Sequence, residues 1–139
     1  MIRFAAATFV ALLLSTAAFA GDGGGGGDGQ SEFTMPSNNV GCIYTPEGGT
    51  ATYSTADGGA ELSCDRVEPS YVRVVLGAHG MARKYTHVGD ASCCGADNYL
   101  AYGETWAEGP FSCISAATGL TCTRGSHGFV MNRKGVKAY

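Results

Sequence analysis

The chain has 139 residues, including 22 Gly, and carries a net charge of −3 with only 15% charged residues. This length suits one domain of ordinary size. An apolar share of 45% is too high for a disordered chain, and no cluster of Lys or Arg is present to bind nucleic acid. We therefore expect a small globular protein whose partners are not DNA or RNA.

Residues 1–20 have the three-part layout of a secretory signal peptide. Arg3 supplies the positive start, an apolar stretch follows, and Ala18 and Ala20 are the small residues of a cleavage site. The apolar run is shorter than the roughly 20 residues that a membrane-spanning helix needs. We expect a secreted or periplasmic protein with no membrane anchor after signal cleavage.

The rest of the chain divides into a linker and one domain. Residues 21–31 are rich in Gly and have no apolar side chain to bury, which is typical of a flexible linker. Residues 32–139 show short alternating apolar runs separated by turn residues, which predicts a single all-β domain. We expect a small disulfide-stabilised sandwich or barrel of about seven to nine short strands. The expected strands are residues 40–44, 51–55, 61–67, 71–76, 81–88, 111–115, 120–124 and 129–133, with a further piece at 136–139.

Six cysteines in an exported chain indicate a disulfide framework. A metal site is disfavoured because the sequence contains no Cys-x-x-Cys pair. The six are Cys42, Cys64, Cys93, Cys94, Cys113 and Cys122. A bridge between Cys113 and Cys122 is the first pair predicted, because two strands folding back across the Thr118-Gly119 turn would bring them together.

The remaining four cysteines leave alternatives open. Cys42 and Cys64 lie on expected strands two turns apart and are the next pair favoured. Cys93 and Cys94 are adjacent, and neighbours in an extended strand point to opposite faces. They either bond to partners on two sides, such as Cys42 and Cys64, or form a ring with each other. Elimination favours the ring.

Several strings along the domain resemble a known pattern. The opening FTMPSNNVGC, from Phe33 to Cys42, is similar to F-x-x-P-S-G-N-I-G-C, with Asn38 in place of Gly. Further strings agree in order: Cys64-Asp65, Cys94 ahead of Leu100-Ala101-Tyr102-Gly103, Phe111-Ser112-Cys113, Gly119-Leu120-Thr121-Cys122, and His127-Gly128-Phe129 with Asn132-Arg133. The domain thus resembles a family of short exported bacterial proteins catalogued as a domain of unknown function. The resemblance implies a compact exported domain and adds no chemistry.

No motif predicts catalysis or a cofactor. The sequence has neither G-x-S-x-G nor H-E-x-x-H, and the acidic stretch 90–97 lacks the ligand spacing of a calcium loop. We therefore predict no catalytic, cofactor-binding or metal-binding residue. His127 and Gly128 are expected to form a structural turn, with Phe129 entering the core.

An aromatic group is the candidate binding surface. It consists of Tyr99, Tyr102, Glu104 and Trp106, and aromatic rings beside carboxylates suit sugar rings or peptides. The alternative for Trp106 is a core anchor of a small β domain. The expected function is that of a monomeric, non-enzymatic binding or structural protein of the cell envelope, with an unknown protein or glycan as its partner. Alternatives are an inhibitor of an extracytoplasmic hydrolase such as a lysozyme, and a small hydrolase.

Overall fold

The computed structural model describes residues 29–139 as two antiparallel β-sheets of five strands each. The expected signal peptide, 1–20, and most of the expected linker lie outside the described residues. In sheet A the strands follow one another in chain order: β1 (Ser31–Thr34), β2 (Val40–Thr45), β3 (Glu61–Arg66), β4 (Val72–Leu76) and β5 (Arg83–Tyr85). Sheet B has the same simple order: β6 (Thr105–Glu108), β7 (Phe111–Ala116), β8 (Gly119–Arg124), β9 (His127–Asn132) and β10 (Gly135–Ala138).

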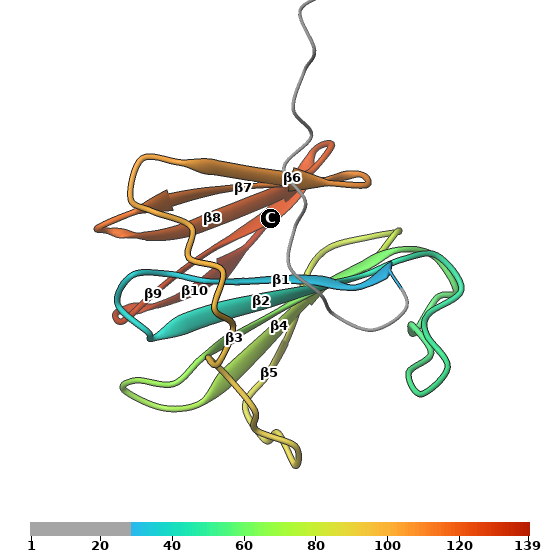
Figure 1. Ribbon diagram of the computed structural model, residues 1–139, viewed down its shortest axis with the longest axis horizontal. Helices are drawn as coiled ribbons and strands as arrows, with labels where there is room; N and C mark the ends of the chain where they lie inside the picture. The colour runs from blue at the N-terminus through green and yellow to red at the C-terminus, as the bar shows by residue number, and fades with distance from the viewer. Residues whose placement is uncertain (1–28) are drawn as a thin grey trace, which may run out of the picture.

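The two sheets form two layers around one core (Figure 1). Alternation along the strands explains this arrangement, since every second side chain points to the same face. In β4, Val72, Val74 and Leu76 are buried in the core, and Arg73 lies on the opposite face. Aromatic contacts join the layers, with the ring centroids of Tyr44 in sheet A and Phe111 in sheet B 6.1 Å apart. The all-β prediction is confirmed, and the fold is a sandwich.

Two disulfides lie at the centre of this core. Cys42 pairs with Cys64 across β2 and β3, and Cys113 pairs with Cys122 across β7 and β8, each with a Cα–Cα distance of 4.1 Å. The sulfurs of Cys42, Cys64 and Cys122 lie within 4.8 Å of one another, so the two bridges meet between the sheets. As disulfide sulfurs they do not offer thiolates to a metal ion. The third bridge joins Cys93 and Cys94, so the structure has the three pairs that the sequence favours.

The structure corrects several expected strands. Residues 29–139 contain ten strands where about seven to nine were expected, because β1 and β6 were missed. Both are short edge strands with a single strongly apolar side chain, Phe33 and Trp106 respectively, so their pattern in the sequence is weak. Residues 51–55 form no strand, and β1 begins at Ser31 inside the expected linker. Between residues 29 and 139, no helix has the length and apolar character needed to cross a membrane.

Gly128 in β9 lies too close to its neighbours to accept a side chain. A Cβ at this position would be 2.5 Å from the carbonyl oxygen of Cys122 and 3.0 Å from the ring of Tyr139. We expect Gly128→Ala to lower the free energy of unfolding by about 1–3 kcal/mol in urea denaturation, as overpacking does. Gly135→Ala is the control, because a Cβ there meets nothing within 4 Å. Equal losses from the two substitutions would contradict the prediction.

Candidate functional site

The face of sheet A that points away from sheet B is covered in part by two loops, residues 46–60 and 86–104. An outer face of a sandwich is ordinarily open to solvent and tolerates polar side chains because water satisfies them. Here four polar residues on or beside that face are buried: Thr34, Thr45, Glu61 and Asp65 are at most 7% exposed. We call this side of sheet A the covered face.

The loop 86–104 crosses the covered face on its way from β5 to sheet B. Figure 1 shows it passing over β3, β2 and β1 before it reaches β6. Backbone hydrogen bonds attach it to β1: the Thr34 amide donates to Asn98 O at 2.8 Å, and the Leu100 amide donates to Thr34 O at 3.0 Å. Tyr99 thereby forms an isolated parallel bridge with Thr34. The loop is thus held as an additional layer over the sheet.

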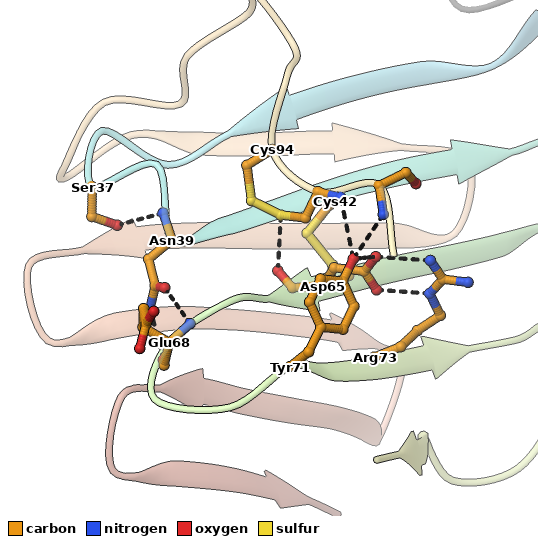
Figure 2. Close-up of a disulfide and its surroundings, with 11 residues drawn as sticks. Ser37, Asn39, Cys42, Asp65, Glu68, Tyr71, Arg73 and Cys94 are labelled. Atoms are coloured by element: carbon orange, nitrogen blue, oxygen red, sulfur yellow. Dashed lines mark hydrogen bonds and ion pairs between the residues drawn. A yellow bond between two sulfur atoms is a disulfide. The ribbon is translucent and has the colours of Figure 1, made fainter. Parts of the chain in front are cut away.

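The Cys93–Cys94 ring packs directly on the backbone of the covered face. A Cβ on Gly41 of β2 would lie 3.2 Å from the Cys93 sulfur and 3.4 Å from the Cys94 sulfur, so a larger residue there would require the ring to shift. The Cys93 sulfur also lies 3.5 Å from the carbonyl oxygen of Asp65. The ring therefore holds the loop close to β2 and β3, as Figure 2 shows.

A charged network joins β3 and β4 to the same loop (Figure 2). The Asp65 carboxylate accepts hydrogen bonds from Arg73 Nε at 2.7 Å and from Arg73 Nη2 at 2.8 Å, and it also accepts one from the Tyr71 hydroxyl. Arg73 Nη1 donates to Asp90 in the loop at 2.8 Å. The Tyr71 oxygen accepts the backbone amides of Ser92 and Cys93, each at 3.1 Å. Asp65, Tyr71 and Arg73 thus connect the sheet to residues 90–93 of the loop.

These contacts fix the ionisation states of Arg73 and Tyr71. The hydrogen bond to Asp65 raises the pKa of Arg73 above its ordinary value, so the guanidinium keeps its charge. Burial, and then the hydrogen bond to Asp65, raise the pKa of Tyr71, so the phenol keeps its proton. A charged donor and a neutral donor therefore meet one carboxylate, and such charge-assisted hydrogen bonds are stronger than neutral ones.

Two hollows lie on the covered face, on either side of Arg73. The smaller, of about 50 Å³, lies under residues 92–96, beside Ser63 and the Gly41 backbone. The larger, of about 240 Å³, lies under the two loops, and its lining includes Tyr53, Glu61, Tyr85, His87 and Asp90. The larger hollow thus combines aromatic rings with carboxylates and one arginine. Its lining has two carboxylates, Glu61 and Asp90, and one cationic side chain of the Arg or Lys type, Arg73. The hollow therefore favours neutral or cationic ligands over anions.

Tyr53 lines the larger hollow and is hydrogen-bonded there to a buried carboxylate. Its hydroxyl donates to Glu61 at 2.6 Å, and Glu61 is only 2% exposed. Burial and the hydrogen bond to Glu61 raise the pKa of Tyr53 from 10.0 to about 12. The folded protein therefore holds this proton more tightly than the unfolded chain, and the contact stabilises the fold fully below pH 10.0 and progressively less as the pH rises to about 12.

We expect an alkaline absorbance titration to detect this phenol. The wild-type protein will show a tyrosine that ionises near pH 12, and Tyr53→Phe will lack it. Glu61→Gln will move the same step to lower pH, because the hydrogen bond to a carboxylate and its negative charge both raise the pKa of Tyr53. If the step near pH 12 persisted in Tyr53→Phe, the assignment would be wrong.

The structure separates the aromatic residues that the sequence grouped as a binding surface. Trp106 packs toward the core, with its ring centroid 5.1 Å from that of Phe33 and 6.3 Å from that of Tyr44. Tyr99 and Tyr102 are about half exposed, at 53% and 46%. Glu104 accepts a hydrogen bond from the Ala101 amide at 3.2 Å and so closes the turn around Tyr102. Trp106 therefore takes the role of core anchor, and Tyr102 lies at another hollow described below.

The turn expected at His127 and Gly128 lies two residues earlier. Both residues belong to β9, and Arg124 pairs with His127 across Gly125 and Ser126. Gly128 exchanges backbone hydrogen bonds with Tyr139 at 2.8 and 2.9 Å. Among the hydrogen bonds of residues 29–139, the histidine rings contribute one, between His87 Nδ1 and Thr86 Oγ1 at 3.3 Å.

The residues of the charged network were missed by the sequence analysis. Arg73 and Asp65 look like ordinary outward positions of strands, and Asp90 is separated from both by an irregular loop. The one signal that could have found them is a charged side chain next to buried apolar positions, Asp65 after Cys64 in β3 and Arg73 between Val72 and Val74 in β4, because such residues are rarely buried without a partner. Their convergence is decided by the pairing of Asp65 with Arg73 across β3 and β4.

Fold and site together define a two-layer antiparallel β-sandwich with one face partly covered by loops around an Asp–Arg–Asp network. No family model matches the chain. No curated protein and no solved structure matches it either. The resemblance to the exported bacterial family stays a prediction.

Proposed function

We propose that this chain is an exported, monomeric, non-enzymatic binding protein of the cell envelope or the extracellular space, and that it binds a neutral saccharide on the covered face. The observation that supports this most directly is the hollow of about 240 Å³ lined by Tyr53, Tyr85, His87, Glu61 and Asp90. Pockets for small ligands combine apolar or aromatic walls with a few fixed polar groups. This hollow has both.

Each lining group suits a hydroxyl-rich ring. Tyr85 is 42% exposed and Tyr53 45% exposed, so both rings have surface free for the C–H face of a sugar. The side chain of Asp90 is 81% exposed, while Arg73 holds one of its oxygens at 2.8 Å. A carboxylate that is fixed on one side and open on the other is a ready acceptor for sugar hydroxyl groups.

Export is supported by two independent features. The first twenty residues have the layout of a secretory signal. Every cysteine of the chain is paired in the structure, and chains with several disulfides are typical of oxidising compartments. Saccharides are abundant in those compartments, which agrees with the proposed ligand class.

The test is calorimetric titration of the purified mature protein with a panel of neutral, cationic and anionic oligosaccharides. We expect a neutral sugar to bind, and Tyr85→Ala and Asp90→Asn each to weaken it at least tenfold. Tyr102→Ala is the matched control, since this exposed tyrosine lies outside the covered face. The proposal fails if no sugar binds at millimolar concentration, or if the control weakens binding as much as Tyr85→Ala.

Inhibition of an extracytoplasmic hydrolase is the second candidate, and Tyr99 favours it. Tyr99 is 53% exposed, and its backbone is held to β1 because Asn98 accepts a hydrogen bond from the Thr34 amide and Leu100 donates one to the Thr34 carbonyl. Rigid, exposed tyrosines are frequent energetic centres of protein interfaces. If this function holds, the protein will slow a lysozyme or related hydrolase, and Tyr99→Ala will abolish the effect while leaving sugar binding unchanged.

A further inference from the structure

A third hollow lies away from the covered face, at the end of the sandwich where three turns meet. Its volume is about 370 Å³, larger than either hollow on the covered face. It is lined by the β1–β2 turn, the β7–β8 turn, the β9–β10 turn and Tyr102. We call it the end pocket.

The floor of the end pocket is apolar. Met35 and Val40 are each 3% exposed and Met131 is fully buried, so the pocket closes on apolar lining residues from both sheets. The exposed Tyr102 and Ala117 stand at its rim. A floor of this kind suits a ring or a short acyl segment, and a dry cavity of roughly 150 Å³ already holds benzene.

The rim of the end pocket is polar and positively charged. Arg133 and Lys134 are both exposed lining residues, and no Asp or Glu is among the lining residues. Within residues 29–139, neither cation has a carboxylate oxygen within 4.0 Å. Ser37 and Thr118 add hydroxyl donors. The charge balance is therefore opposite to that of the covered face.

A buried arginine beside the pocket strengthens this positive character. Arg66 is only 4% exposed and has no carboxylate partner among the described residues. Its Nη1 donates to the carbonyl oxygen of Asn132, a lining residue of the pocket, at 2.8 Å, and its Nη2 donates to Ser70 O at 3.1 Å. Its Nε has no hydrogen-bond partner in the part of the chain that is described. A buried cation with incomplete pairing is unfavourable, and an anion bound nearby lowers its energy.

The turns around the pocket are held by side-chain hydrogen bonds to the backbone. Asn39 accepts from the Glu68 amide at 2.7 Å and donates to Glu68 O at 3.1 Å, as Figure 2 shows. Asn132 Oδ1 accepts the amides of Lys134 at 2.9 Å and Gly135 at 3.1 Å. The cationic rim thus stands on a fixed turn, which lowers the entropy lost on binding.

We propose that the end pocket is a second ligand site, which binds a small amphipathic anion with its ring or acyl segment on the Met35–Val40–Met131 floor and its carboxylate or phosphate against Arg133 and Lys134. This site is independent of saccharide binding on the covered face. The apolar floor selects for the ring or acyl segment, and the rim selects for the negative head group.

The test uses NMR amide-shift titration of the mature protein with four probes: 3-phenylpropionate, phenyl phosphate, the neutral 3-phenylpropionamide and inorganic phosphate. We expect both aromatic anions to shift the amide resonances of Ser37, Thr118 and Lys134. Comparing the affinities of 3-phenylpropionate and phenyl phosphate will show whether a carboxylate or a phosphate head group is preferred. The neutral amide and inorganic phosphate will bind at least tenfold more weakly, because each lacks one half of the recognised chemistry.

Two double variants decide whether the rim is responsible. Arg133→Ala with Lys134→Ala will weaken both aromatic anions at least tenfold. Arg83→Ala with Lys84→Ala removes the same charge from exposed positions of β5 and will leave the affinity within about twofold. The site is refuted if the neutral amide binds as tightly as the anions, if inorganic phosphate alone does so, or if the two double variants weaken binding equally.

Discussion

Cys42→Ala with Cys64→Ala will lower the free energy of unfolding by about 3.4 kcal/mol through the lost loop closure alone, because this bridge spans a sequence separation of 22. Cys113→Ala with Cys122→Ala spans a separation of 9, and the same loop-closure argument gives about 2.5 kcal/mol. All four cysteines are at most 2% exposed, so each double variant adds a similar cavity penalty. The difference between the two therefore reports the loop length, and guanidinium denaturation measures it.

The bridge between Cys93 and Cys94 supplies the control for that prediction. It joins adjacent residues and closes no longer loop of the chain, so loop-closure entropy contributes nothing comparable to global stability. We expect Cys93→Ser with Cys94→Ser to leave the unfolding midpoint much closer to wild type than either core variant. A loss as large as that of Cys42→Ala with Cys64→Ala would contradict the loop-closure argument.

Asp65→Asn will have the largest effect among substitutions on the covered face. The change removes the negative charge from a carboxylate that is 9% exposed and leaves Arg73, 20% exposed, with only Asp90 as a charged partner. Breaking a buried ion pair by removing one partner costs about 3–5 kcal/mol. The partial exposure of Arg73 places the expectation near the lower end, about 3 kcal/mol, since solvent screens part of the interaction.

Asp90→Asn is the matched control for that substitution. It removes the other carboxylate of Arg73 but at a side chain that is 81% exposed, so the expected loss is below about 1 kcal/mol. Hydrogen exchange adds a local readout, because the Ser92 and Cys93 amides donate to Tyr71, which donates to Asp65. We expect these amides to exchange faster in Asp65→Asn than in Asp90→Asn, because Asp65 holds the Tyr71 hydroxyl that accepts them. Equal exchange in the two variants would contradict this role of Asp65.

Most of the strands could be predicted from the sequence because they carry their own pattern. In β2, β4 and β9, apolar side chains alternate and the ends are marked by turn residues, so burial on one face is readable without knowing the partner strand. β1 and β6 have no such pattern and become strands through pairing with β2 and β7. Edge strands depend on their neighbour, and the neighbour is a tertiary feature.

The disulfides also differ in how much of their arrangement a local sequence pattern predicts. The bridge between Cys113 and Cys122 is a local hairpin contact, and the turn between them is visible in the sequence. Elimination among the cysteines favours the ring of Cys93 and Cys94. The packing of the ring on Gly41 could not be predicted, because nothing in residues 86–104 indicates which sheet they cross. The same missing information concealed the network of Asp65, Arg73 and Asp90.

Local patterns of residues are enough to predict the all-β class and the core strands, because alternation and hairpin turns act over a few residues. They favour the three cysteine pairs but leave another pairing of Cys42, Cys64, Cys93 and Cys94 open. Tertiary structure alone decided that the chain forms two layers, that the loop 86–104 crosses sheet A, and that the two larger hollows carry opposite charge. Arg73 and Asp90 are 17 positions apart, and Arg66 and Asn132 are 66 apart. Contacts at such separations depend on where the loops pass and how the sheets pack, which no local pattern of residues encodes.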